Sequence, residues 1–321
     1  MDAPRQQAAA DPAFRGDVLA GLAAPIPAVP ARWLYDRRGS ELFEAITELP
    51  EYYPTNVERS LLEAHSPDVA RIVGTGDAVV EFGSGSSTKT PVLLRAVKPA
   101  AYVPIDISGA FLRDSAAALQ RDFPALPIYP VEADFMSPIA LPAEVAALPK
   151  LGFFPGSTIG NLVARTAVDL LRAMKETLGV GAWLLIGMDR IKDIDVLLAA
   201  YDDAAGVTAA FNLNLLHRIN AELDGDIPVE AFRHRAIWND RMSRIEMHLE
   251  ALRDVRFQVS GEPFSFRAGD TIHTENSHKY GFRDSRLLLR AAGWGICQEW
   301  TDPDDQFALL LVEAEAPRFA P

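Results

Sequence analysis

The sequence predicts an α/β fold in which helices cover both faces of a largely parallel sheet. The central third alternates continuous apolar runs with amphipathic stretches, as strands and helices do in such folds. A glycine-rich turn follows the first of these runs, and two further β-like runs close the chain. Single cores stop growing at roughly 250–300 residues. The 321 residues therefore indicate two domains or one interrupted domain.

Five apolar runs are predicted to be the strands of this sheet. Each is short and continuously apolar, which is typical of a strand buried on both faces. The runs are residues 78–82, 101–105, 127–131, 151–154 and 182–186. Helical segments lie between them, such as the one around residues 112–121.

After Asp189 the pattern changes. One helical stretch is expected over residues 194–223, and residues 244–249 alternate polar with apolar side chains, as a strand with one solvated face does. A helix resumes around Asp284 and ends at Gly293, and two β-like runs follow at residues 294–300 and 307–312. These last pieces are predicted to complete the first sheet.

The economical topology is a sheet interrupted by an insertion over residues 191–280. The expected ligand-binding sheet domain comprises residues 57–190 and 281–321. The expected second, inserted α+β domain comprises residues 13–56 and 191–280, and residues 1–12 are expected to be disordered.

Composition excludes several classes of function. The 44 acidic and 31 basic residues give a net charge of −13, which disfavours nucleic acid and anionic membranes as partners. With Cys297 as its one cysteine, the chain forms no internal disulfide, and the six histidines match no H-E-x-x-H motif, so no metal site is predicted. No long apolar run or signal peptide is recognised, and a cytoplasmic protein is expected.

The glycine-rich turn after the first strand predicts a ligand site. Gly83 and Gly85 allow a tight turn and let a ligand approach the amides at the start of the next helix. A P-loop and a dinucleotide fingerprint each need a further glycine where Thr88 stands, so both are weak matches. S-adenosylmethionine, which carries no phosphate, needs only the two glycines that are present.

Acidic residues at the next two strand ends favour the same ligand. Asp106 follows the second strand, where a carboxylate can bind the two ribose hydroxyls, and Asp134 with Phe135 follows the third, where they can contact the adenine. Ligands of open α/β sheets bind outside the carboxyl ends of the strands. The alternative is that these acids are solvated turn residues or helix caps.

Five other stretches carry more polar and aromatic side chains than packing requires. They are residues 33–43, 49–55, 154–161, 200–208 and 272–280. With them the chain closely resembles the bacterial L-histidine Nα-methyltransferases of ergothioneine biosynthesis, over about Arg32 to Leu311. The resemblance implies a Rossmann-like S-adenosylmethionine-dependent methyltransferase sheet with an inserted substrate-binding domain. It also implies transfer of three methyl groups to the α-amine of L-histidine, giving hercynine.

The resemblance places the roles of individual residues. It implies that the residues that bind the cofactor are Gly83, Ser84, Gly85, Lys89, Asp106, Asp134 and Phe135. It implies that the substrate's α-carboxylate and amine are bound by Asn161, Tyr201, Tyr52 and Tyr35. It implies that the imidazole is bound by Glu275 and Ser277. The expected partners are L-histidine and its mono- and dimethylated forms, and the protein is expected to be a monomer.

Simple chemistry is compatible with these roles. Glu275 and Ser277 are two residues apart, so on a strand both side chains point to one face and can hydrogen-bond the two ring nitrogens. Without the resemblance, a surface position for Glu275 is the favoured interpretation. Tyr35 and Tyr52 are the candidate catalytic residues, accepting or relaying the amine proton. The expected wall around the methylated nitrogen consists of Phe43, Gly156 and Thr158.

Three alternatives remain open at this point. The first is a methyltransferase of the same architecture that acts on another small amine or amino acid. A non-catalytic nucleotide-binding module and a P-loop NTPase are the alternatives from other classes.

Overall fold

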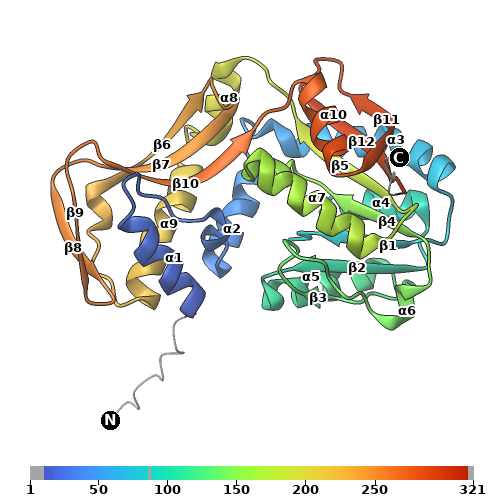
Figure 1. Cartoon of the computed structure of the whole chain (residues 1–321), viewed down its shortest axis with the longest axis horizontal. Helices are drawn as coiled ribbons and strands as arrows, with labels where there is room; N and C mark the ends of the chain where they lie inside the picture. Colours follow the sequence, from blue (N-terminus) through green and yellow to red (C-terminus); the bar gives the residue numbers. More distant parts are fainter. Residues whose placement is uncertain (1–10, 86–87, 317–321) are drawn as a thin grey trace, which may run out of the picture. The chain divides into compact units, whose positions relative to one another are not determined.

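The computed structural model describes residues 11–85 and 88–316, which form two compact units (Figure 1). The first unit contains the described residues through Glu51 together with Ile194–Asn239 and Ile245–Asn276. The second unit contains Tyr52–Asp193, Asp240–Arg244 and the described residues from Ser277 onward.

The bounds of the two units differ from the expected domains by a few residues. Residues 52–56, 191–193, 240–244 and 277–280 lie in the second unit, whereas they were expected in the inserted domain. Of the N-terminal residues expected to be disordered, 1–10 lie outside the described residues. Asp11 and Pro12 are ordered, because the Asp11 carboxylate accepts a hydrogen bond from the Ala13 amide at 2.8 Å and Pro12 begins a helix.

The second unit is built on a seven-stranded sheet with strand order β11-β12-β5-β4-β1-β2-β3. Its strands are β1 (Ala78–Phe82), β2 (Ala101–Asp106), β3 (Val131–Glu132), β4 (Lys150–Phe154), β5 (Trp183–Asp189), β11 (Trp294–Thr301) and β12 (Phe307–Ala314). The first five are parallel, while β12 runs antiparallel to β5 and β11 antiparallel to β12. The predicted α/β sheet, completed by the C-terminal runs, is confirmed.

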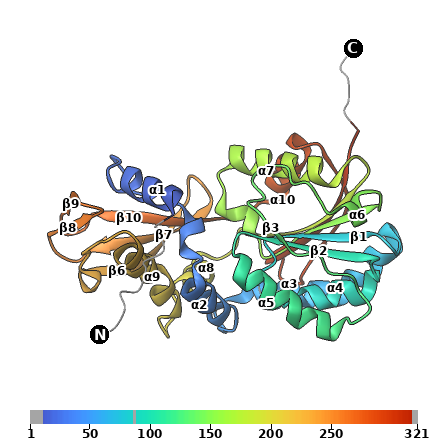
Figure 2. The same ribbon diagram turned by 90° about the horizontal axis from the view of Figure 1, so that it is seen from below.

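Helices cover both faces of this sheet, as Figure 2 shows for α7 and α10 on one side and α4 and α5 on the other. They are α3 (Tyr53–Val73), α4 (Thr90–Val97), α5 (Gly109–Asp122), α6 (Ala143–Ala146), α7 (Ala164–Leu178) and α10 (Phe282–Ala291). Strand side chains alternate between the two cores: Val80 packs with the α7 side and Val79 with the α3 side. As predicted, α10 ends before Gly293, which has a φ of +83°.

The first unit combines helices with antiparallel strands. Its helices are α1 (Pro12–Leu22), η1 (Ala31–Leu34), α2 (Arg37–Thr47), α8 (Ile194–Tyr201), α9 (Val207–Glu222) and η3 (Val229–Ala231). Strands β6 (Phe232–Asn239), β7 (Arg244–Ala251) and β10 (Thr271–His278) form a sheet in the order β10-β7-β6, and β8 (Val255–Val259) pairs with β9 (Glu262–Phe266). On β7 the buried Ile245, Met247 and Leu249 alternate with more polar positions, as the sequence predicted.

Two predicted elements were wrong in extent. Residues 127–130 do not form a strand, because Pro127 and Pro130 lack the amide hydrogens that a ladder needs. One bridge forms between Ile128 and Tyr102, and β3 is confined to Val131–Glu132. The helix expected over residues 194–223 is two helices. Asp203 separates them, since its carboxylate accepts the amides of Val207 and Thr208 at the start of α9.

No helix in the described parts of the chain combines the length and the apolar character needed to cross a membrane.

A buried carboxylate lies within the core of the second unit. Glu81 on β1 is 1% exposed and accepts hydrogen bonds from Thr90 Oγ1 on α4, at 2.7 Å, and from the Tyr102 hydroxyl on β2. Burial raises the pKa of Glu81 to about 7, although both hydrogen bonds oppose this change. Folding therefore favours the protonated form of this group.

The free energy of unfolding should consequently fall as the pH rises from about 4.5 to about 7, since only the folded state then holds the Glu81 proton. Glu81→Gln keeps an acceptor but does not titrate. We expect the difference in free energy of unfolding, variant minus unsubstituted protein, to increase by about 2 to 3 kcal/mol between pH 5 and pH 8. Urea unfolding of both proteins across this range is the measurement, and parallel profiles would contradict the pKa assignment.

Candidate functional site

The glycine turn lies between β1 and α4 in the second unit. Gly83 and Gly85 have φ values of +72° and +49°, which favour glycine. The amides of Gly83 and Ser84 donate to the carbonyl of Ile105 at 2.9 and 3.1 Å, so the turn is held against the end of β2. Ser86 and Ser87, the next two residues of the motif, lie outside the described residues.

The structure brings the turn together with two of the predicted cofactor residues. Asp106 ends β2, and its carboxylate accepts the Gly85 amide at 3.0 Å and the Ser108 amide at 2.9 Å. A Cβ added to Gly83 would lie 3.4 Å from the ring of Phe135, so the ring lies against the turn. Asp134 is exposed and accepts the Met136 amide at 3.0 Å. A glycine turn, a carboxylate beside it and an aromatic face form a chemically suitable set for an adenosyl ligand.

Lys89 is engaged by a residue that the sequence analysis missed. The carboxylate of Glu58 on α3 is fully buried and lies 2.5 Å from Lys89 Nζ. It also accepts the Gly156 amide at 2.9 and 3.0 Å. A Cβ on Gly187 would lie 2.0 Å from Glu58, so only glycine leaves room for the carboxylate there. Glu58 thus connects α3, the start of α4 and the loop after β4.

The loop after β4 carries Gly156, Thr158 and Asn161. Gly156 has a φ of +78°, Thr158 Oγ1 donates to the Pro155 carbonyl at 3.0 Å, and Asn161 is half-buried at the end of the short 3₁₀-helix η2 (Thr158–Asn161). His278 at the end of β10 donates from Nδ1 to the Gly160 carbonyl at 2.8 Å. The predicted Asn161 loop is therefore held beside the end of the strand that carries Ser277.

A buried network surrounds Asp189 at the end of β5. Its carboxylate accepts hydrogen bonds from the Tyr53 hydroxyl at 2.8 Å, Lys192 Nζ at 2.5 Å and Lys279 Nζ at 2.7 Å. Lys279 Nζ also donates to Ser277 Oγ at 2.8 Å. The side chains of Asp189 and Lys279 are 1% and 0% exposed. Ser277 is therefore held by a chain of charged groups that begins at the sheet.

The charges in this network are mutually dependent. Burial alone would raise the pKa of Asp189, but Lys279 and Lys192 outweigh it and hold that pKa below its usual range. Burial lowers the pKa of Lys192 to about 8, against the opposing effect of Asp189. The carboxylate is therefore ionised and needs its cations.

In the first unit, Glu275 and Tyr35 lie in contact, although the resemblance assigned them to opposite ends of the substrate. The Tyr35 hydroxyl donates to Glu275 Oε1 at 3.2 Å, and Glu275 is buried on β10. The ring of Tyr35 lies 5.6 Å from that of Phe43 and 5.5 Å from that of Phe211, both in edge-on arrangements. A carboxylate beside an aromatic cluster can bind a small ring that carries an N–H group.

The other predicted substrate residues divide between the units. Tyr201 lies in the first unit at the end of α8, is 8% exposed and accepts a hydrogen bond at its carbonyl from His234 Nε2 at 2.8 Å. Tyr52 lies in the second unit directly before α3 and is also 8% exposed. Asn161, Gly156, Thr158 and Ser277 belong to the second unit, whereas Tyr35, Phe43 and Glu275 belong to the first.

Some of the missed residues carried a sequence signal. Asp189 follows a continuous apolar run, which is the same signal that identified Asp106. Glu58 shares a helix face with the buried Thr55, Leu61 and Leu62. A carboxylate on a largely apolar helix face indicates a buried, paired charge. Nothing local to Lys279 indicated that its ammonium would be buried.

Replacing Lys279 tests the buried network. Lys279→Met should lower the free energy of unfolding by about 3 to 5 kcal/mol, because it leaves the buried Asp189 carboxylate with less compensating charge. The matched control is Arg113→Met, which removes an exposed ion pair with Glu132 and should cost under about 1 kcal/mol. Equal losses for both variants, measured by urea unfolding, would show that the network is not a buried charge cluster.

Comparisons with known proteins identify the family of the chain. Residues 14–314 match the family described as histidine-specific methyltransferase, SAM-dependent. The histidine N-alpha-methyltransferases of Mycolicibacterium smegmatis and Mycobacterium tuberculosis are 41% and 40% identical to the chain, each over 94% of both chains. Ergothioneine biosynthesis protein 1 of Neurospora crassa is 31% identical over 89% of this chain and 33% of its own length. The chain belongs to the family of S-adenosylmethionine-dependent, histidine-specific methyltransferases.

Proposed function

We propose that the protein transfers three methyl groups from S-adenosylmethionine to the α-amine of L-histidine, giving hercynine in ergothioneine biosynthesis. The observation that carries this proposal is the buried carboxylate of Glu275, which accepts a hydrogen bond from the Tyr35 hydroxyl. Glu275 lies on the strand that also holds Ser277. The 41% identity to a histidine N-alpha-methyltransferase over nearly the whole chain also supports the proposal.

The cofactor is held by Gly83, Ser84, Gly85, Lys89, Asp106, Asp134 and Phe135. When bound, S-adenosylmethionine supplies a methyl group on a positively charged sulfur. Asp106 accepts the amides of Gly85 and Ser108, which fixes the orientation of its carboxylate, and its role is to bind the ribose hydroxyls. Phe135 supplies the flat apolar surface beside the turn for the adenine.

Glu275 and Ser277 recognise the two nitrogens of a neutral imidazole. An ammonium group only donates, so Ser277 Oγ accepts from Lys279 and directs its own hydroxyl hydrogen to another acceptor. That hydrogen is donated to the ring nitrogen without a proton, and Glu275 accepts the N–H of the other. A substrate without both ring nitrogens leaves these polar groups unpaired, which gives strong discrimination.

The reacting amine is bound by hydroxyl and amide groups, and the hydroxyl groups accept or relay its proton. Free α-amino groups titrate near pH 8 or above, so a proton has to leave before each transfer. Tyr35 donates to Glu275, and the hydroxyls of Tyr35 and Tyr52 accept or relay the amine proton. Asn161 and Tyr201 orient the α-carboxylate and amine, and Phe43, Gly156 and Thr158 leave space for the growing number of methyl groups.

The same proposal covers the setting of the reaction. Histidine and its mono- and dimethylated forms are the partners, and the enzyme acts as a cytoplasmic monomer. The single cysteine, Cys297, is compatible with a reducing compartment.

Methylation of a panel of free amino acids tests the proposal. Purified protein is incubated with labelled S-adenosylmethionine and each amino acid, and products are identified by mass spectrometry. We expect trimethylated product with L-histidine and none with the others. Preferred methylation of another amine would show a different substrate for the same architecture, and no methyl transfer to any of them would contradict the proposal.

Glu275→Ala separates substrate recognition from cofactor binding. We expect histidine affinity to fall about 10- to 100-fold, because a charged hydrogen bond to the ring is lost, with the affinity for S-adenosylmethionine unchanged. The control is Glu250→Ala on β7, whose carboxylate pairs with Arg233 and Arg235. Calorimetric titration of both ligands measures the effect, and unchanged histidine affinity would overturn the role of Glu275.

A further inference from the structure

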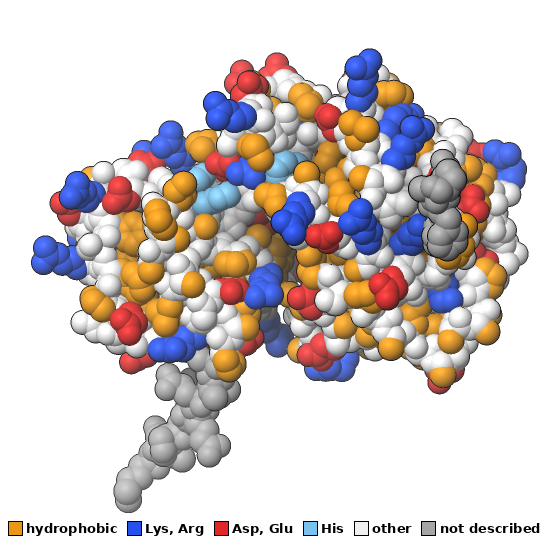
Figure 3. Space-filling model, in the orientation of Figure 1, with side chains coloured by type: hydrophobic (Ala, Val, Ile, Leu, Met, Phe, Trp, Pro, Cys, Tyr) orange, Lys and Arg blue, Asp and Glu red, His pale blue; other side chains and the backbone are white. Residues whose placement is uncertain are grey.

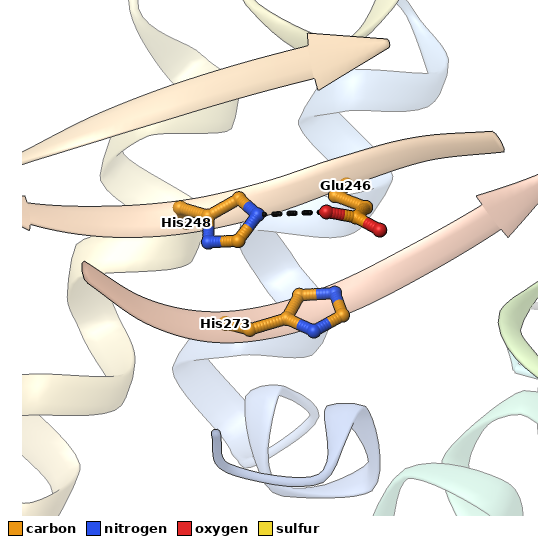
Figure 4. A group of neighbouring side chains, drawn as sticks. All are labelled: Glu246, His248 and His273. Carbon is orange, nitrogen blue, oxygen red and sulfur yellow. Dashed lines mark hydrogen bonds and ion pairs between the residues drawn. The ribbon is translucent and has the colours of Figure 1, made fainter. Parts of the chain in front are cut away.

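A cluster of metal-ligating side chains lies in the first unit, apart from the residues assigned above. Glu246 and His248 are two residues apart on β7, and His273 lies on the neighbouring strand β10. One ligand atom from each of the three lies within 4.8 Å of the others (Figure 4). No motif in the sequence predicts this cluster, because the E-x-H spacing of Glu246 and His248 suits a strand and His273 is distant in the chain.

The geometry is close to that of a three-ligand metal site. His248 Nε2 and Glu246 Oε2 are 3.2 Å apart, and the rings of His248 and His273 are stacked at 4.8 Å. Tetrahedral zinc with bonds of about 2.0 to 2.2 Å places its donor atoms about 3.3 to 3.5 Å apart. The Glu246–His248 separation is within about 0.1 Å of that spacing, and a shift of about 1.3 Å by the His273 ring would complete the set.

Hydrogen bonds from outside the cluster orient two of the three ligands. His273 Nε2 lies 3.0 Å from the carbonyl of Glu275, which can only accept, so Nε2 carries the hydrogen and Nδ1 presents a lone pair. Asn239 Nδ2 donates to Glu246 Oε1 at 2.8 Å, which leaves Oε2 toward the histidines. A carbonyl behind a ligating histidine and an amide behind a ligating carboxylate are the usual outer contacts of a metal site.

The cluster is sheltered yet reachable from solvent. The side chains of Glu246 and His248 are 9% and 12% exposed, and His273 is half-buried. Figure 3 shows histidine side chains at the surface over β7 and β10. Two imidazoles and one carboxylate select a divalent transition metal over Mg²⁺ or Ca²⁺, which prefer oxygen ligands.

We propose that Glu246, His248 and His273 bind one divalent transition-metal ion, with Zn²⁺ the best chemical match. The ion joins β7 to β10 and leaves a fourth position for water. Because it binds groups on two strands of the folded sheet, it stabilises the first unit. The site is independent of histidine methylation, since none of its ligands is assigned to substrate or cofactor.

Zinc binding is tested on the full chain without a polyhistidine tag, after treatment with a chelator and without histidine or S-adenosylmethionine. We expect one equivalent of Zn²⁺ to bind by calorimetry and to raise the melting temperature by several degrees, with no such effect from Mg²⁺. Co²⁺ in the same site should give the intense visible absorption of a tetrahedral complex. Absence of stoichiometric Zn²⁺ binding would overturn the proposal.

Substitutions assign the binding to these residues. His273→Ala and Glu246→Gln should each weaken Zn²⁺ binding about 100-fold and abolish the rise in melting temperature. The matched control is His217→Ala, which removes an exposed histidine from α9 and should bind as the unsubstituted protein does. Circular dichroism shows whether each variant folds. Folded variants that retain full Zn²⁺ affinity would contradict the assignment.

Discussion

The arrangement of the second unit depends on the burial of the Asp189 carboxylate with two ammonium groups. Lys192 follows it closely in the chain, whereas Tyr53 begins α3 and Lys279 follows β10. A carboxylate with 1% exposure is stable only while these donors compensate its charge. This requirement joins three segments that are far apart in the sequence at the end of β5, and through Lys279 it fixes the position of Ser277.

Two further buried carboxylates act in the same way around the glycine turn. Glu58 joins α3 to Lys89 and to the Gly156 amide, and Glu81 joins β1 to Thr90 and Tyr102. Lys89, Thr90 and Gly156 follow the carboxyl ends of β1 and β4, where ligands of this fold class bind, whereas Tyr102 lies near the start of β2. Buried carboxyl groups therefore hold the start of α4 and the loop after β4 through hydrogen bonds.

Much of the second unit could be predicted because its signals are local. Continuous apolar runs identified β1, β2, β4 and β5, and the strand-end rule placed Asp106 beside the glycine turn. Where proline removes ladder hydrogens, as at Pro127 and Pro130, the same apolar run no longer forms a strand.

The remaining features depend on distant partners. Whether Lys279 is buried depends on Asp189, 90 residues earlier in the chain, and whether His273 meets His248 depends on strand pairing. Glu275 shows the limit clearly: spacing alone favoured a surface position, whereas the structure buries it against Tyr35. Only the resemblance to a family supplied that role, because one sequence does not display the contact.

Histidine recognition is tested most directly by a crystal structure of the protein with L-histidine and S-adenosylhomocysteine. We expect one imidazole nitrogen within hydrogen-bond distance of the Glu275 carboxylate and the other within hydrogen-bond distance of Ser277 Oγ, with Lys279 still bonded to Ser277. An imidazole bound away from both residues would contradict the proposed recognition of histidine.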